Sequence, residues 1–126
     1  MNVGSAGAMM NVEGTLIVQL NPTLTDAAVR QLRSVVGVSL EARSPRGLVL
    51  DLAGVDAMDS YITRCIRDLA ISARLMGVPT IVCGVQPAVA DTLVEMGLSL
   101  GDVSTALDLD GALHLLRSRR PARARA

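Results

Sequence analysis

The stretch Gly47–Cys83, "GLVLDLAGVDAMDSYITRCIRDLAISARLMGVPTIVC", places two short apolar runs on either side of a longer amphipathic segment. The runs "LVLDL" and "TIVCGV" are typical of strands that are covered on both faces. Between them, apolar residues recur at helical spacing: Ile62, Cys65, Ile66, Leu69, Ala70, Ala73 and Met76. Gly77 can end this helix in a left-handed conformation. Strand, helix and strand in this order predict a right-handed crossover between parallel strands.

The residues before this unit predict a hairpin and a second helix. "MMNVEGTLIVQL" has the pattern of two short strands joined at Glu13 and Gly14. After Asn21 and Pro22 break the second strand, Thr25 is a good cap for an amphipathic helix, "DAAVRQLRSVVGVSLEAR". The apolar stripe of that helix consists of Ala28, Val29, Leu32, Val35, Val36 and Leu40.

The residues after it continue the alternation of strands and helices. Pro87 suits the first position of a helix that carries Val89, Ala90, Leu93, Val94 and Met96 and is closed by Gly97. "STA" predicts a short edge strand, and Asp108 can cap a last helix that runs to about Leu116. The whole pattern predicts one α/β domain with a mostly parallel central sheet, an N-terminal hairpin and about four helices.

The composition agrees with a single domain whose core is built from aliphatic side chains. The chain has 126 residues, half of them apolar, with one Tyr and neither Phe nor Trp. A chain of this length can bury a core without disulfides or metal ions. We expect residues 1–8 to be a flexible N-terminus, residues 9–116 to form the domain, and residues 117–126 to be a basic, disordered tail.

The charges divide the chain unevenly. All twelve acidic residues precede residue 117, together with seven arginines, so this part carries a net charge of −5 and the tail +5. The folded part therefore lacks the basic face of a nucleic-acid-binding domain. The sequence contains no signal peptide and no run of about 20 apolar residues. We expect a cytoplasmic protein that binds neither nucleic acid nor membrane.

Catalytic chemistry has little support in the sequence. Asp51, Asp56 and Asp59 could form a magnesium or phosphoacceptor cluster at a strand end. However, there is no glycine-rich phosphate loop, and the only histidine, His114, is expected on the surface of the last helix. Cys65 and Cys83 are flanked by apolar residues, which indicates buried, reduced thiols. We therefore expect no enzyme activity, no metal site and no cofactor.

Ser60 allows two interpretations. A serine before an apolar helix is commonly a cap, whose hydroxyl accepts hydrogen bonds from free backbone amides. The same position also suits phosphorylation, because a helix N-terminus tolerates added negative charge. The residues alone favour the cap.

A resemblance to a known protein family favours phosphorylation of Ser60 over the cap. Four segments carry it, in this order: "VDAMDSY", "SARLMG", "GVQPAVADTLVEMG" and "TALDLDGAL". From about Met9 to Leu116 the chain resembles a STAS domain, and more narrowly the RsbS-type stressosome proteins. The resemblance implies a non-enzymatic scaffold that forms homo- and hetero-oligomers with RsbR-type proteins. It also implies that an RsbT-type serine/threonine kinase is held by the assembly, phosphorylates the serine of the "DS" motif, here Ser60, and is then released.

A second member of the same family stays open as an alternative, a free anti-sigma factor antagonist that binds an anti-sigma factor kinase one to one. Those antagonists have a small residue and a glycine soon after their serine, whereas "YITR" follows Ser60 here. This difference favours the scaffold. A domain that regulates a membrane transporter is disfavoured, because no membrane segment is attached in this sequence.

The candidate partner-binding residues surround Ser60. Asp56 and Asp59 would add their charges to a phosphate on Ser60. Tyr61 could anchor a partner or could instead cover the core. Arg64 and Arg67, with Arg74, lie on the polar side of the helix, either solvated or in contact with a subunit or the kinase.

Overall fold

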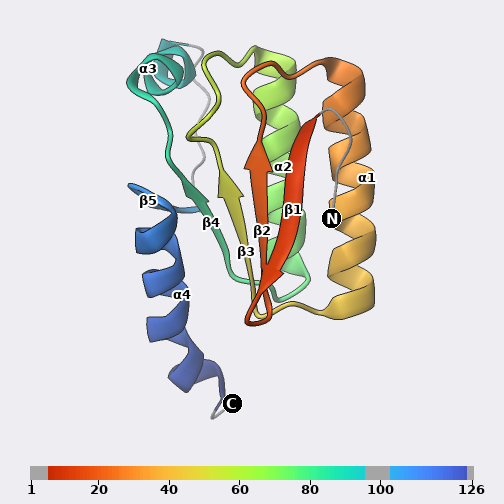
Figure 1. The fold of residues 1–126 in the computed structure, drawn as a ribbon, viewed down its shortest axis with the longest axis vertical. Helices are drawn as coiled ribbons and strands as arrows, with labels where there is room; N and C mark the ends of the chain where they lie inside the picture. The colour runs from red at the N-terminus through yellow and green to blue at the C-terminus, as the bar shows by residue number, and fades with distance from the viewer. Residues whose placement is uncertain (1–5, 96–102, 125–126) are drawn as a thin grey trace.

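The computed structural model describes residues 6–95 and 103–124, and these form a layered α/β fold (Figure 1). Its strands are β1 (Gly7–Val12), β2 (Thr15–Leu20), β3 (Gly47–Asp51), β4 (Thr80–Cys83) and β5 (Ser104–Ala106). Its helices are α1 (Asp26–Arg43), α2 (Ser60–Leu75), α3 (Pro87–Glu95) and α4 (Leu109–Ala124). The described elements therefore have the order that the sequence predicts.

The described strands form one sheet in the order β1-β2-β3-β4-β5. β1 and β2 are antiparallel, and every later neighbour pair is parallel. A two-residue turn joins β1 to β2, and both of its residues have positive φ, 53° at Glu13 and 85° at Gly14. Turns of this kind match the twist of the flanking strands and fix the register of a hairpin. The predicted hairpin and mostly parallel sheet are confirmed.

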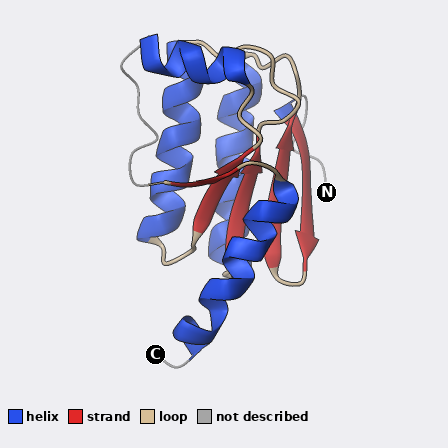
Figure 2. Cartoon of the chain, turned by 90° about the vertical axis from the view of Figure 1, so that its left-hand side faces the viewer, coloured by secondary structure: helices blue, strands red, loops and turns tan. Residues whose placement is uncertain are grey.

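Helices cover both faces of the sheet. Figure 2 shows α1 and α2 on one side and α4 on the other. Side chains of α1 and α2 enclose the main core with Leu16, Val18, Leu48 and Leu50, all buried. On the opposite face a smaller cluster consists of Ile17, Val49, Ile81, Cys83, Ala112 and Leu116. β2, β3 and β4 thus have apolar side chains on both faces, which explains their near-continuous apolar sequences.

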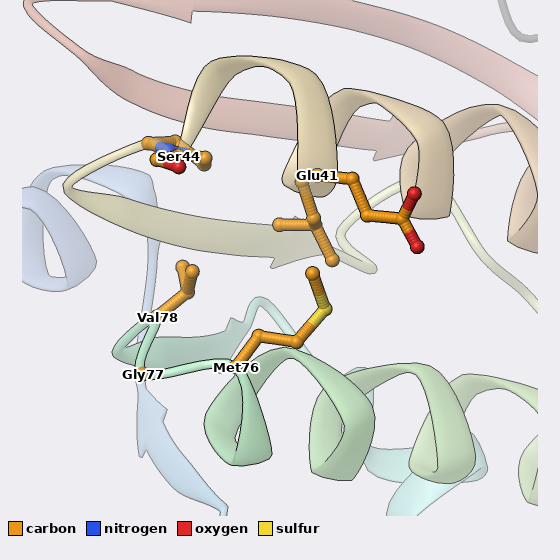
Figure 3. Close-up of a pocket in the computed structure, with 7 residues that line it drawn as sticks. Glu41, Ser44, Met76, Gly77 and Val78 are labelled. Atoms are coloured by element: carbon orange, nitrogen blue, oxygen red, sulfur yellow. The ribbon is translucent and has the colours of Figure 1, made fainter.

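The helix ends show why α1 and α2 begin and end where they do. The hydroxyl of Thr25 accepts a hydrogen bond from the Ala28 amide at 3.1 Å, as the sequence predicts for a cap. α1 is followed by Ser44 in the left-handed conformation (φ 43°), and α2 is followed by Gly77 at φ 81°. These two C-terminal ends lie next to each other and, with Glu41 and Met76, line a small pocket of about 180 Å³ (Figure 3). It lies at the opposite ends of α1 and α2 from Ser60.

Two boundaries and one side chain differ from the predictions. Ala6 is fully buried, its carbonyl accepts a hydrogen bond from the Asn21 amide at 2.8 Å, and β1 begins at Gly7, so residues 6–8 belong to the domain. α4 continues to Ala124, beyond the predicted end at Leu116, and takes in most of the segment expected to be a disordered tail. The arginines and alanines there have high helix propensity, which favours continuation of the helix. In α3, Val89 and Leu93 are buried but Val94 is 79% exposed; Met96 and Gly97 lie outside the described residues.

Candidate functional site at the start of α2

The loop from β3 to α2 is held first by Asp51, the last residue of β3. Its side chain is buried, and Oδ1 accepts a hydrogen bond from the Ala53 amide at 3.0 Å. The other oxygen, Oδ2, accepts a longer hydrogen bond from Gln19 Nε2 at 3.5 Å. Asp51 is therefore a structural residue of the loop. Within the described residues, no group of three or more His, Cys, Asp or Glu side chains could hold a metal ion.

The end of β4 holds the same loop from the other side. The Leu52 amide donates to the Cys83 carbonyl at 2.9 Å, and Gln86 Nε2 donates to the Ala53 carbonyl at 2.7 Å. Gly84 has φ 72°, and a Cβ there would lie only 2.9 Å from the Ala53 Cβ. A side chain at this position would push the loop away, so glycine permits the close approach. The residues leading to Ser60 thus start from a fixed point.

Asp59, and not Ser60, caps α2. Asp59 has an extended backbone (φ −89°, ψ 178°), and its Oδ1 accepts a hydrogen bond from the Ile62 amide at 2.8 Å. Ser60 is the first residue of the helix itself. The cap interpretation of Ser60 is therefore wrong, because a helix start has one cap position and the carboxylate one residue earlier occupies it.

Three adjacent hydroxyl groups differ in how far they are engaged. The Thr63 side chain is buried, and its hydroxyl donates to the Asp59 carbonyl at 2.8 Å. The Tyr61 hydroxyl lies close to the Arg30 guanidinium. The Ser60 hydroxyl has no hydrogen bond to any other described residue, and the side chain is half-buried at the protein surface. Of the serine and threonine hydroxyls in this segment, that of Ser60 is consequently the one left without a hydrogen bond to the described residues.

Tyr61 connects α2 to α1. The Arg30 guanidinium lies close to the Tyr61 hydroxyl, and its interaction with that hydroxyl raises the pKa of Arg30 above its ordinary value. The Tyr61 side chain is 37% exposed, so one part of the ring packs on the protein and another faces solvent. Tyr61 therefore lies on the side of α2 that faces α1.

A groove of about 480 Å³ opens beside Ser60. One wall comes from the loop after β2, residues Pro22, Thr23 and Leu24, and the other from the β3–α2 loop and the start of α2, residues Asp56, Ala57, Met58, Asp59 and Ile62. Asp56 and Asp59 are exposed, whereas Met58 and Ile62 are buried. The groove, called here the Asp56–Asp59 groove, thus combines an apolar floor with two carboxylates.

Arg64 and Arg67 are exposed on α2. They follow Ser60 by four and seven residues, so the three side chains share one face of the helix. The candidate residues therefore form two groups that meet at Ser60: Asp56 and Asp59 at the groove, and Arg64 and Arg67 along the helix. Tyr61 lies at the flank that faces α1.

Neither thiol is exposed at this surface. Cys65 and Cys83 are free and buried, as predicted. Burial, followed by the nearby Asp51 carboxylate, raises the pKa of Cys83 to about 12. His114 is exposed on α4, also as predicted. Among the described residues, no helix is both long and apolar enough to cross a membrane.

Sequence reasoning did not identify two parts of the site. Arg30 lies in α1 and meets Tyr61 only because the two helices pack together. The wall Pro22–Leu24 lies beside Asp56 because β2 and β3 are parallel neighbours whose following loops leave the same edge of the sheet. The predicted parallel pairing of these two strands is the one feature of the sequence from which the position of residues Pro22–Leu24 could have been inferred.

Comparison with known families and structures identifies the class of this fold and site. The STAS domain family model matches residues 8–112, so the chain belongs to the STAS domain family. A relative from Bacillus subtilis, the RsbT co-antagonist protein RsbRD, is 30% identical over 113 residues, which cover 90% of this chain. The match covers 41% of that longer relative.

Two solved structures are similar over nearly their whole length. A serine-to-glutamate variant of Moorella thermoacetica RsbS has a TM-score of 0.83 and 32% identity, covering 93% of this chain and 99% of that one. A chain from a study of the molecular architecture of the stressosome has a TM-score of 0.78 and 33% identity, covering 88% and 96%. The anti-sigma factor antagonist SpoIIAA, at 16% identity and a TM-score of 0.67, shares the fold. The relatives that are at least 30% identical to this chain are thus an RsbT co-antagonist, an RsbS protein and a stressosome-related chain.

Proposed function

We propose that this protein is a non-enzymatic stressosome scaffold that retains an RsbT-type serine/threonine kinase and releases it when Ser60 is phosphorylated. It would act in the cytoplasm, in homo- and hetero-oligomers with RsbR-type STAS proteins, and control a stress-response signalling cascade. The observation that carries the proposal is the free hydroxyl of Ser60 at the start of α2, next to the Asp56–Asp59 groove.

Phosphorylation of Ser60 is compatible with the fold. Asp59 already caps the helix through the Ile62 amide, so the Ser60 hydroxyl can be modified without loss of that hydrogen bond. A helix N-terminus also stabilises an anionic group through its dipole and its unpaired amides. The expected effect of phosphorylation is therefore a change of surface and not unfolding.

The surface change would weaken a docked partner. A phosphate adds about −1.5 to −2 charges at neutral pH, beside two exposed carboxylates. A kinase packed over the groove and over Tyr61 would meet repulsion and a desolvation cost. A coupling free energy of about 1–3 kcal/mol would lower its affinity about 5- to 150-fold. Arg64 and Arg67 would supply the positive contacts of the same docking surface.

Similarity to known proteins favours a scaffold over a free antagonist. The two stressosome-related structures are 32% and 33% identical to this chain, whereas SpoIIAA is 16% identical. The mass of the protein with its partner in solution separates the two functions. A particle far larger than the chain supports the scaffold, and a one-to-one complex supports the free antagonist.

A kinase pull-down tests the switch. Ser60→Asp should weaken kinase retention, whereas Ser60→Ala should keep the kinase bound. Ser72→Asp is the matched control, because Ser72 is an exposed serine of the same helix three turns away. Equal retention by Ser60→Asp and Ser60→Ala would contradict the proposal, as would equal loss in the Ser60→Asp and Ser72→Asp variants.

Phosphopeptide mapping tests the modification itself. Cleavage after arginine yields the peptide Gly47–Arg64, whose hydroxyl groups are those of Ser60, Tyr61 and Thr63. In protein from stressed cells we expect phosphate on Ser60, since Thr63 is buried and the proposed kinase acts on serine and threonine and not on tyrosine. Phosphate on Thr63, or none under any stress, would argue against the switch.

A further inference from the structure

We propose that β1 is an interface through which two copies of this chain pair edge to edge across a two-fold axis, joining their sheets into one. The inference concerns the sheet edge remote from β5 and does not depend on the phosphorylation of Ser60. It rests on the hydrogen-bonding direction of β1, on its lack of charge and on the apolar side chains that it leaves exposed.

β1 is an edge strand with unused backbone groups. It pairs with β2 on one side, and in the described part of the chain no strand pairs with its other side. The two-residue turn makes Val12 and Thr15 a hydrogen-bonded pair, so the even-numbered residues of β1 bond to β2. The next even-numbered residue, Ala6, follows the same pattern, because its carbonyl accepts a hydrogen bond from the Asn21 amide at 2.8 Å. The backbone N–H and C=O groups of Gly7, Met9 and Asn11 therefore point outward.

β1 lacks the features that normally protect a sheet edge. Edge strands usually carry a lysine, a proline, a bulge or an inward-pointing charge that prevents pairing with another chain. The sequence of β1, "GAMMNV", contains neither a charged residue nor proline. Its register with β2 is unbroken from Gly7 to Val12, so there is no bulge. The edge is thus open to an added strand.

The side chains beside this edge are apolar. Met10 lies opposite the buried Ile17, on the sheet face that α4 covers only in part. α4 packs on β3, β4 and β5, and Met10 and Val12 stay 37% and 39% exposed. Figure 1 shows α4 next to β4 and β5, at the far side of the sheet from β1. An occupant of this edge must therefore be uncharged and apolar on that face.

A second copy of the chain meets these requirements. If Met9 lies on the two-fold axis and the strands are antiparallel, Met9 pairs with the partner's Met9, and Gly7 pairs with the partner's Asn11. All three outward-facing residues of each strand are then paired, each pair exchanging two hydrogen bonds. On the exposed face, Met10 lies opposite the partner's Ala8, a large residue against a small one. No like charges face each other along the strand.

Such an interface is isologous, which is the commonest symmetry of soluble oligomers. Because it consists of one short strand and a small apolar patch, it should be weak. We expect a dimer that dissociates on dilution, with a Kd in roughly the micromolar range.

Sedimentation velocity over a series of concentrations of the full chain tests the interface. The unmodified protein should shift from monomer to dimer, and Met10→Lys should weaken the dimer at least tenfold, because lysine is a typical guard of sheet edges. Val38→Lys is the matched control, since Val38 is an apolar residue of α1 that is 64% exposed. A protein that stays monomeric at every concentration, or a Met10→Lys variant that dimerises like the control, would overturn the proposal.

Disulfide trapping tests the register separately. Positions 8 and 10 of the two copies form non-hydrogen-bonded pairs, with Cα atoms about 4.5 Å apart, which suits a disulfide. The double variant A8C/M10C should form a covalent dimer on oxidation, with position 8 of one copy linked to position 10 of the other. V12C should remain monomeric, because residue 12 lies opposite residue 6 in this register. Cross-linking of V12C as efficient as that of A8C/M10C would rule the register out.

The test is distinguishable from that of the kinase switch. Met10 and Ser60 lie on different surfaces, so a monomeric Met10→Lys variant can be assayed for kinase retention on its own. Failure to dimerise overturns the β1 interface and leaves the assignment of Ser60 unaffected.

Discussion

At the scale of single residues, Asp59 and Ser60 are neighbours in the chain with separate tasks. The Asp59 carboxylate bonds the Ile62 amide, whereas the Ser60 hydroxyl is free of hydrogen bonds to other described residues. Asp59→Ala should therefore lower the free energy of unfolding by about 1 kcal/mol, and Ser60→Ala by less than about 0.5 kcal/mol. Urea denaturation of the two variants measures both values. A larger loss in Ser60→Ala would show that the serine is the cap after all.

Cys83 makes the stability of the protein depend on alkaline pH. Burial and Asp51 raise the pKa of this thiol from 9.0 to about 12. Between these two values the unfolded chain loses the proton and the folded protein keeps it, so deprotonation favours the unfolded state. The stabilising contribution is complete below pH 9.0 and is lost as the pH rises toward about 12.

We therefore expect the free energy of unfolding to fall across that pH range, and to fall less steeply in Cys83→Ala. Urea denaturation at several alkaline pH values measures the slope. Cys65→Ala is the control, because Cys65 is also a buried, free cysteine. Identical slopes in the unmodified protein and in Cys83→Ala would contradict the expectation.

At the scale of elements, α1 and α2 end in similar left-handed conformations with different residues. At φ 43° the Cβ of Ser44 causes steric strain that a glycine would avoid. Gly77, at φ 81°, has no Cβ and is free of this strain. Ser44→Gly should raise the free energy of unfolding by about 0.5 kcal/mol, and Gly77→Ala should lower it by about 1 kcal/mol. A Cβ at Gly77 would meet no atom within 4 Å, so backbone conformation alone is tested. Thermal unfolding of both variants provides the measurement, and changes of the same sign would contradict it.

The order of strands and helices could be predicted because each described element has a local pattern. The stripe from Ile62 to Ala73 has helical spacing, and the apolar run of β3 reflects a strand covered on both faces. The end of α4 could not be predicted, since Leu116 is the last described apolar contact and the arginines after it suit a helix and a disordered tail alike.

The site was predictable in part for the same reason. Asp56, Asp59 and Ser60 are close in sequence, so their proximity in space follows from the loop and helix start. The assignment of the cap to Asp59 depends on a backbone angle, and the contact of Arg30 with Tyr61 depends on how two helices pack. Neither the cap at Asp59 nor the contact of Arg30 with Tyr61 produces a pattern that can be recognised in a single sequence.

At the scale of the whole molecule, the described side chains that hold α4 to the sheet lie in its N-terminal half. Ala112 and Leu116 are buried against Ile17, Val49 and Ile81. A Cβ at Gly47 would lie only 2.9 Å from Leu116 Cδ1, so Leu116 fills the space above this glycine. Removal of residues 121–126 should therefore leave the melting temperature unchanged. Leu116→Ala should lower the free energy of unfolding by about 2–5 kcal/mol, because it leaves a cavity in the smaller core.

Differential scanning calorimetry of the truncated chain and of the Leu116→Ala variant makes this comparison. A truncation that lowers the melting temperature as much as Leu116→Ala would mean that the last residues of α4 stabilise the domain.

The position of Tyr61 has an optical consequence. It is the sole aromatic residue of the sequence, and it lies directly after Ser60 with its hydroxyl close to Arg30. Every photon of intrinsic near-ultraviolet fluorescence that the chain emits therefore originates at the candidate docking surface. A phosphate or a tryptophan-free partner placed there should alter the intensity or anisotropy of that emission, whereas a change at β1 should leave it constant. The protein thus carries its own label at the position where binding is to be observed.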